Sequence, residues 1–281
     1  MSAETFESWI GREEVRSDQL HASTVASLAA TLNVAWSPTP GEALPPGWQW
    51  LFFNPVAARS ELGIDGHPAR GGFLPPIGLP RRMWAGSRIP YLADLPVAAV
   101  ATRRSRILKI EHKSGKRGSL CFVTVEHTTR HGGTDCIIEQ QDIVYRDATP
   151  PGSAPPPTPE RYAGEPQWGR DEQADTILLF RYSALTFNGH RIHYDLAYAR
   201  DDEGYPGLVV HGPLTATLLQ AFAVEHGGNR TLAGFDFRGM APLFVDRPFR
   251  LEGRQQDADT LDVWARGHDG ELAMSAIARF R

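Results

Sequence analysis

The chain has 281 residues, of which 41% are hydrophobic and 22% charged, and its formal net charge is −4. This composition is ordinary for a globular protein, and the length suggests two domains. The slightly acidic balance excludes the basic surface typical of nucleic-acid binding. The polar N-terminus is unlike a signal peptide, and no apolar run approaches the ~20 residues of a membrane span. We therefore expect a cytoplasmic protein that binds neither nucleic acid nor membrane.

The first 147 residues are predicted to form one helix and a sheet. Residues 19–33 carry apolar side chains at helical spacing and predict a helix. The aromatic run at 48–53 predicts a short strand. Three later runs alternate apolar and polar residues between glycine-containing turns, which indicates an antiparallel meander. These runs are residues 101–112, 118–130 and 134–146.

Residues 71–86 combine glycine, proline and large apolar side chains with two adjacent arginines, Arg81 and Arg82. A loop of this length is usually either functional or disordered, and its apolar content favours an ordered binding loop. Surface arginines are most often merely solvated. Beside an apolar loop, however, an arginine can hold a carboxylate or phosphate through two parallel hydrogen bonds. Arg81 or Arg82 is therefore our candidate to bind an anionic group of a ligand.

A proline-rich segment, residues 148–165, is predicted to be a linker between the two halves. The second half repeats the plan of the first, with a helix at 213–226 that has Pro213 in its first turn. Strands are predicted at 176–182, 232–238, 248–255, 261–267 and 271–280. Each half is thus one helix with an antiparallel sheet, an α+β arrangement. A helix wrapped by a curved antiparallel sheet is a hotdog, so we predict a double hotdog with repeats at 1–147 and 166–281.

The titratable residues gather in the stretch 183–225, where His193 is the first candidate for proton transfer. A neutral imidazole can accept or donate a proton near pH 7. A lone histidine is more often structural, but here Asp195 lies two residues on and a helix start follows.

The helix start at Gly212 is the second element of the predicted site. Backbone N–H groups in a first helical turn have no partner inside the helix, and the helix dipole is positive there. An N–H at Gly212 could therefore hold a thioester carbonyl and stabilise the enolate oxygen. A plain helix start, with glycine for tight packing, is equally consistent with the sequence.

Other site classes find less support. His190, His193 and His211 could be read as metal ligands, but no HExxH pattern is present. Neither a GxGxxG motif nor a P-loop occurs. We predict a site without metal and without a bound cofactor.

Several segments resemble the MaoC-like (R)-specific enoyl-CoA hydratases, and more closely their mesaconyl-C4-CoA and itaconyl-CoA hydratase branch and the related fatty-acid-synthase-type dehydratases. The segments are Asn188-Gly189-His190-Arg191-Ile192-His193-Tyr194-Asp195, Gly207-Leu208-Val209-Val210-His211-Gly212-Pro213-Leu214, Phe6 to Arg12, Leu79 to Gly86 and Gln140 to Arg146. The resemblance extends over nearly the whole chain. The resemblance implies a double hotdog with catalysis in the C-terminal repeat and a degenerate N-terminal repeat that helps to shape the acyl pocket.

The wider family carries the pattern Asp-x-Asn-Pro-x-His, whose Asp and His form the catalytic pair. Aligned on its histidine, the pattern places His193 at the catalytic histidine and Asn188 at the aspartate. This is a departure, because an amide cannot act as a general base. Either Asn188 orients the water while His193 handles the proton alone, or a group such as Asp195 or His190 supplies the second function.

The resemblance implies reversible hydration of a short branched dicarboxylic enoyl-CoA, either itaconyl-CoA, giving citramalyl-CoA, or mesaconyl-C4-CoA, in itaconate-type degradation. His193, Asn188 and Gly212 are the expected catalytic residues. The expected substrate contacts are Arg81, Arg82, His190, Arg191, His211 and Asp195. Monomer and homodimer both remain open. The alternatives are a hotdog acyl-CoA thioesterase, a 3-hydroxyacyl-thioester dehydratase of fatty-acid metabolism and a non-catalytic acyl-CoA-binding module.

Overall fold

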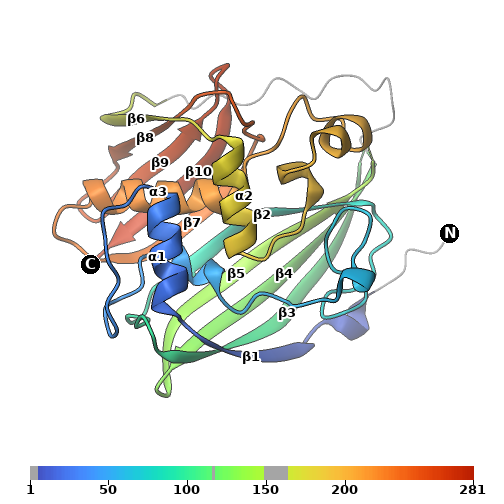
Figure 1. Ribbon diagram of the computed structural model, residues 1–281, viewed down its shortest axis with the longest axis horizontal. Helices are drawn as coiled ribbons and strands as arrows, with labels where there is room; N and C mark the ends of the chain where they lie inside the picture. Colours follow the sequence, from blue (N-terminus) through green and yellow to red (C-terminus); the bar gives the residue numbers. More distant parts are fainter. Residues whose placement is uncertain (1–5, 116–117, 149–163) are drawn as a thin grey trace.

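The computed structural model describes residues 6–115, 118–148 and 164–281 (Figure 1). Its strands form one antiparallel sheet with the order β1-β3-β4-β5-β2-β7-β10-β9-β8-β6. In chain order the strands are β1 (Glu13–Gln19), β2 (Arg81–Pro90), β3 (Val100–Gly115), β4 (Gly118–His131), β5 (Thr134–Arg146), β6 (Trp168–Glu172), β7 (Leu232–Gly239), β8 (Phe249–Gln255), β9 (Thr260–Arg266) and β10 (Leu272–Phe280). The predicted α+β class is confirmed, and the sheet is continuous across both halves.

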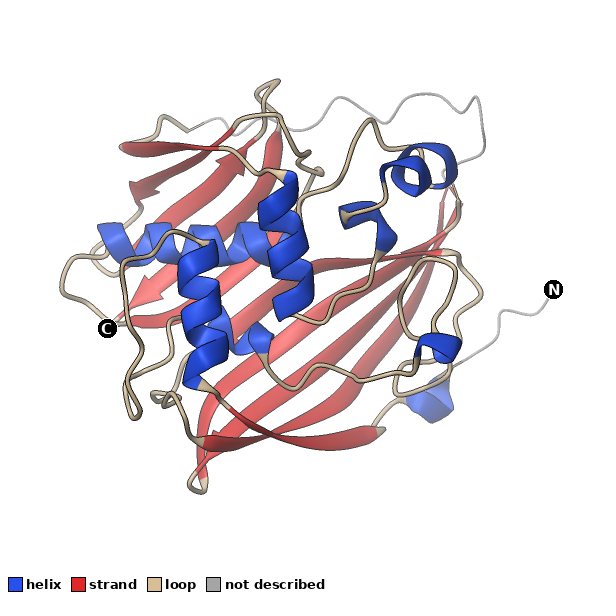
Figure 2. Ribbon diagram, viewed as in Figure 1, coloured by secondary structure: helices blue, strands red, loops and turns tan. Residues whose placement is uncertain are grey.

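Three α-helices accompany the sheet, α1 (Ala22–Thr31), α2 (Thr176–Leu185) and α3 (Gly212–His226), as Figure 2 shows. The short helices are η1 (Glu7–Trp9), η2 (Trp48–Leu51), η3 (Arg59–Glu61), η4 (Arg191–His193) and the π-helical η5 (Tyr198–Asp202). Helix α3 packs against β7, β8, β9 and β10, whereas α1 packs against α2 and η2. The two repeats therefore differ, because the wrapped helix belongs to the second repeat. No helix within the described ranges is long and apolar enough to cross a membrane.

Helix α3 forms where the sequence analysis predicts it. His211, in extended conformation, is its N-cap residue, and Pro213 lies in the first turn, where its missing N–H costs no hydrogen bond. Its side chains Leu214, Leu219 and Phe222 are at most 1% exposed. Burying each such side chain contributes roughly 1.5–3 kcal/mol relative to leaving it in water. The helix is thus fixed with its N-terminal end at a defined place above the sheet.

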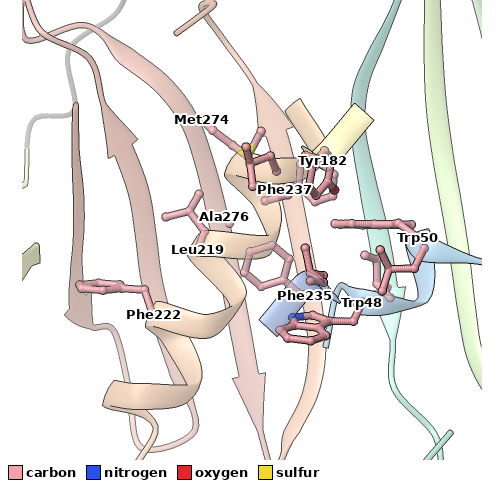
Figure 3. Packing of buried hydrophobic residues seen from close by; sticks show 14 of the residues in the cluster. Trp48, Trp50, Tyr182, Leu219, Phe222, Phe235, Phe237, Met274 and Ala276 are labelled. Carbon is pink, nitrogen blue, oxygen red and sulfur yellow. The ribbon is translucent and has the colours of Figure 1, made fainter. Parts of the chain in front are cut away.

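The two halves meet where β2 pairs with β7. A Cβ on Gly86 would lie 2.2 Å from the carbonyl oxygen of Phe237, so only glycine allows the strands to approach this closely. Side chains from both halves fill the core above this junction (Figure 3): Trp50 from η2 lies with its ring centroid 6.1 Å from that of Phe237 in β7. Packing across the junction joins the repeats into one hydrophobic core.

Three local predictions are wrong. Residues 48–51 form the 3₁₀ helix η2, residues 176–185 form the helix α2, and the predicted loop at 71–86 ends at Arg81, where β2 begins. A short apolar run has no periodicity that separates a buried strand from a buried helix. The Asp175 carboxylate accepts a hydrogen bond from the Leu178 N–H at 2.7 Å, so the N-cap was the sequence signal for α2. Most of the predicted linker, residues 149–163, lies outside the described residues, and the division into repeats at 1–147 and 166–281 stays a prediction.

Candidate active site

The predicted catalytic motif forms a turn between α2 and the 3₁₀ helix η4. The backbone N–H of Asn188 donates to the Ser183 carbonyl at 2.8 Å. The Asn188 Oδ1 accepts a hydrogen bond from the backbone N–H of His190 at 3.0 Å. This side chain therefore shapes the turn, and its amide nitrogen is left to meet a water or a ligand in the adjoining cleft, which Asn188 lines.

Two hydrogen bonds to Val209 hold His193 in place. The Val209 N–H donates to the Ile192 carbonyl at 3.0 Å, and the Val209 carbonyl accepts from Nδ1 of His193 at 2.7 Å. Because a carbonyl can only accept, Nδ1 carries the proton and Nε2 keeps its lone pair. Burial lowers the pKa of His193 to about 4. The ring is therefore neutral at pH 7 and is suited to accept a proton, as predicted.

His211 supports His193 from the core side. The two rings are stacked, with centroids 3.6 Å apart, and Nε2 of His211 lies 2.8 Å from the Ser183 hydroxyl. The His211 side chain is fully buried, and burial lowers its pKa well below the ordinary value. It is not among the residues that line the cleft. His211 thus lies behind the His193 ring, outside the cleft in which the substrate contact was expected.

Gly212 is the first residue of α3 and lies open to the cleft. His211 offers no side-chain cap, and within the described part of the chain no acceptor is found for the Gly212 N–H. A Cβ built on Gly212 would meet nothing within 4 Å. An unpaired donor, at the positive end of a helix and with open space beside it, fits the predicted contact with a thioester oxygen.

Arg191 and Asp195 are paired with each other rather than turned into the cleft. The Arg191 guanidinium donates to the Asp195 carboxylate at 2.7 and 3.0 Å and to the Ile64 carbonyl at 3.1 Å. Asp195 also accepts from the Tyr198 N–H at 3.0 Å. Neither side chain lines the cleft. Their place in the structure is to hold η4, η5 and the segment around Ile64 together.

The two candidate arginines differ in their surroundings. Arg81 forms an ion pair with the Glu203 carboxylate and also donates to the Asp202 carbonyl. Arg82 lies opposite Tyr145 of β5 and hydrogen-bonds its hydroxyl. Among the described residues no carboxylate pairs with Arg82, and its positive charge contributes to the lowered pKa of His67 and His190. Of the two candidates, Arg82 is therefore the one whose charge can pair with a ligand.

Sequence reasoning missed two residues of the first half that join the site, Asp65 and His67. Nδ1 of His67 lies 3.0 Å from the Asp65 carboxylate, and the His67 ring centroid lies 4.2 Å from that of His190. Both residues line the cleft. The only local signal is the Asp-Gly-His sequence, in which aspartate and glycine favour a tight turn.

His190 lies in the middle of this group. Its ring centroid is 5.5 Å from that of His193, and burial together with the neighbouring His67 and His193 lowers its pKa to about 2. Asp65, His67 and His190 also bring potential metal ligands within 4.8 Å of one another. In the structure Nδ1 of His67 instead donates to Asp65, and we interpret the group as a carboxylate–imidazole pair beside a second imidazole. That the protein uses no metal stays a prediction.

The chain is similar in sequence and in fold to several known proteins. A family model for hydroxyacyl-thioester dehydratase type 2 matches residues 47–245. The mesaconyl-C4-CoA hydratase of Chloroflexus aurantiacus is 47% identical over 277 residues and covers 98% of each chain. Among solved structures, a MaoC-like dehydratase from Phytophthora capsici is similar with a TM-score of 0.71 at 12% identity over 96% of each chain. A Mycobacterium tuberculosis protein described as a double hotdog fold matches with a TM-score of 0.62 at 13% identity, again over 96% of each chain.

The fold is a double hotdog, which confirms the predicted architecture, and the matched family and relative confirm the predicted resemblance to MaoC-like dehydratases. The chain belongs to the hydroxyacyl-thioester dehydratase type 2 family. It is accordingly a hydro-lyase, an enzyme that adds water to, or removes it from, a double bond beside a thioester.

Proposed function

We propose that the protein hydrates the double bond of a branched C5 dicarboxylic acyl-CoA, with mesaconyl-C4-CoA as the first candidate and itaconyl-CoA as the second. The observation that carries the proposal is that one cleft is lined by His193, Gly212 and Arg82, which are a base, an oxyanion donor and an unpaired cation. The 47% identity to a mesaconyl-C4-CoA hydratase supports the same substrate class.

Each of these groups has a place in the reaction. The Gly212 N–H polarises the thioester carbonyl and stabilises the enolate oxygen that forms when water attacks Cβ. Nε2 of His193 takes a proton from that water, and the Asn188 amide holds the water. Protonation of the enolate at Cα completes the addition. No step asks Asn188 to act as a base.

Arg82 distinguishes a dicarboxylic substrate from a plain enoyl-CoA. The thioester consumes one carboxyl group of the C5 acid and leaves the other as a free carboxylate. An arginine without a carboxylate partner in the same cleft can bind that group through two parallel hydrogen bonds. Arg81, whose charge Glu203 already neutralises, is not expected to take this role.

The test is incubation of the purified protein with mesaconyl-C4-CoA, itaconyl-CoA and straight-chain enoyl-CoAs, followed by mass analysis for the addition of one water. We expect hydration to be fastest on a dicarboxylic substrate. Release of free thiol without water addition to the double bond would instead identify the thioesterase alternative. Binding without turnover would identify a non-catalytic module.

A second candidate is dehydration of 3-hydroxyacyl thioesters in fatty-acid metabolism, which the name of the matched family favours. It uses the same residues in the reverse direction. The straight-chain substrates decide between the two, because a fatty-acid enzyme would prefer them to the dicarboxylic ones.

A further inference from the structure

We propose that His67, held by Asp65, is a second catalytic acid–base group, which the N-terminal repeat supplies to the C-terminal catalytic motif. This inference rests on the proposed hydration and deepens it. It assigns a residue to the function that the family aspartate carries and that Asn188 cannot perform. The N-terminal repeat then contributes chemistry as well as the shape of the acyl pocket.

The segment that carries His67 is built as a rigid turn. Leu62 and Pro68 form an isolated antiparallel bridge. Inside it the Gly63 N–H donates to the His67 carbonyl at 2.7 Å, and the Gly66 N–H donates to the Gly63 carbonyl at 2.9 Å. We call residues 62–68 the His67 turn. It closes on itself through backbone hydrogen bonds, so its shape does not depend on the His67 ring.

The His67 turn is docked on the catalytic motif through the backbone. The Arg191 N–H donates to the Asp65 carbonyl at 2.9 Å. A Cβ on Gly66 would lie 1.9 Å from the Gly189 carbonyl oxygen, and a Cβ on Gly189 would lie 2.7 Å from that of Gly66. Two glycines thus allow the turn and the motif to touch. This contact brings His67 beside His190 although the two residues are far apart in the sequence.

The resulting array is a row of imidazoles that ends in a carboxylate. His193 lies 5.5 Å from His190, and His190 lies 4.2 Å from His67, between ring centroids. His67 in turn hydrogen-bonds the Asp65 carboxylate at 3.0 Å. His193, at the other end, contacts only a backbone carbonyl through Nδ1. Asp65 is therefore the group in this row that can stabilise a positively charged imidazole.

This asymmetry gives the proton a path. His193 takes a proton from water as the oxygen bonds to Cβ and the π electrons form the enolate. The proton passes across His190 to His67, where the Asp65 carboxylate stabilises the imidazolium. His67 then gives a proton to Cα, and the enolate electrons form the new C–H bond. All imidazoles begin and end neutral, and water has been added across the double bond.

The electrostatics of the Asp65–His67 pair keep its carboxylate charged. Burial raises the pKa of Asp65, but the hydrogen bond and charge of His67 outweigh burial and leave its pKa well below the ordinary value. The carboxylate is thus ionised at neutral pH. Burial and the charges of Arg82 and Arg70 lower the pKa of His67, and the hydrogen bond and charge of Asp65 oppose that effect. His193 has no carboxylate beside it to do the same.

The experiment compares His67→Gln, Asp65→Asn and the double variant on the best enoyl-CoA substrate. His268→Gln is the matched control, since His268 is an exposed turn residue that does not line the cleft. We expect His67→Gln to lower kcat about 10²- to 10⁴-fold, the usual contribution of a positioned acid–base group. KM should stay within about threefold, which a merely structural role would not produce. Asp65→Asn should lower kcat less than His67→Gln does. The double variant should have the same kcat as His67→Gln, because Asp65 acts through His67.

Three results would overturn the inference. One is a kcat of His67→Gln within about threefold of wild type. Another is a double variant whose fold-loss in kcat equals the product of the losses of the two single variants. The third is one equivalent of divalent metal in the wild type that His67→Gln loses together with activity, which would make the group a metal site. These results differ from failure of the proposed function, in which the wild type hydrates none of the enoyl-CoAs. Unfolding temperatures of all variants show whether the fold is intact.

Discussion

The imidazole rings of His193 and His211 lie 3.6 Å apart between centroids, with planes only 19° from parallel. His211 is fully buried and bonded to the Ser183 hydroxyl on its far side. His211 thus covers one face of the His193 ring, and another part of the His193 ring lines the cleft. The neutral His211 ring restrains the His193 ring without adding a charge. The pKa of His193 is therefore set mainly by burial, which lowers it, and the hydrogen bond to the Val209 carbonyl raises it.

The first prediction concerns the pH dependence of kcat/KM. His193 has to be neutral to accept a proton, and its pKa is lowered to about 4. The active form is therefore present above about pH 4, and initial rates should stay level from pH 8 down to about pH 5.5. A fall in kcat/KM with an inflection between pH 6 and 7 would contradict this assignment, because it would indicate an unperturbed imidazole.

The second prediction concerns the substrate preference of Arg82→Ala. Loss of a charged hydrogen bond costs roughly 1.5–3 kcal/mol, or about 10- to 150-fold in kcat/KM. We expect this loss on dicarboxylic enoyl-CoAs and little change on plain ones. Arg88→Ala is the control, since Arg88 lies on the same strand but pairs with Asp142 at 2.6 Å outside the cleft. Equal losses on both substrate classes would remove the carboxylate-binding role of Arg82.

The third prediction tests how the His67 turn is docked. Gly66 has φ +85° and no room for a Cβ, because the Gly189 carbonyl oxygen would be 1.9 Å away. Gly66→Ala should lower the free energy of unfolding by at least ~1 kcal/mol, the cost of a left-handed non-glycine residue, and should also lower kcat. Gly72→Ala, in the same loop, meets nothing within 4 Å and should leave the unfolding temperature unchanged. If both variants behave alike, the close approach of the two backbones is not what holds the turn.

The fourth prediction concerns acid stability. The pKa of His193 is lowered to about 4, that of His127 to about 3 and that of His190 to about 2, in each case mainly by burial. In the unfolded chain these groups titrate near pH 6.5. Below that pH the unfolded state binds more protons, so the free energy of unfolding falls as the pH falls, by up to about 1.4 kcal/mol per pH unit for each histidine. At pH 6.5 each histidine has already lost about 0.4 kcal/mol of this stability, which is almost fully present one pH unit higher.

Urea unfolding at pH 7.5, 6.5, 5.5 and 4.5 measures this effect. The midpoint should fall slightly between the first two values and more steeply through the last two. His127→Gln should make the decline shallower, whereas the exposed His268→Gln should not. A midpoint that stays level down to pH 4.5 would show that these histidines do not become protonated on unfolding.

Sequence periodicity was sufficient for the regular elements and insufficient for the ambiguous ones. In the meander, β4 alternates because one face of the strand lies on the core, and α3 has both a helical stripe and a proline in its first turn. The runs at 48–53 and 176–182 are apolar at nearly every position, and neither period appears in them. Packing around Trp50 and the Asp175 cap decides these cases.

The sequence by itself determined the candidate motif around His193 and the helix start at Gly212, because both depend on residues that are neighbours in the chain. Only the tertiary structure decided that Arg81 is neutralised by Glu203 while Arg82 is not, and that His67 lies beside His190. These relationships join segments more than a hundred residues apart. They depend on how the sheet and the His67 turn place these segments in space, and a local sequence pattern cannot predict that placement.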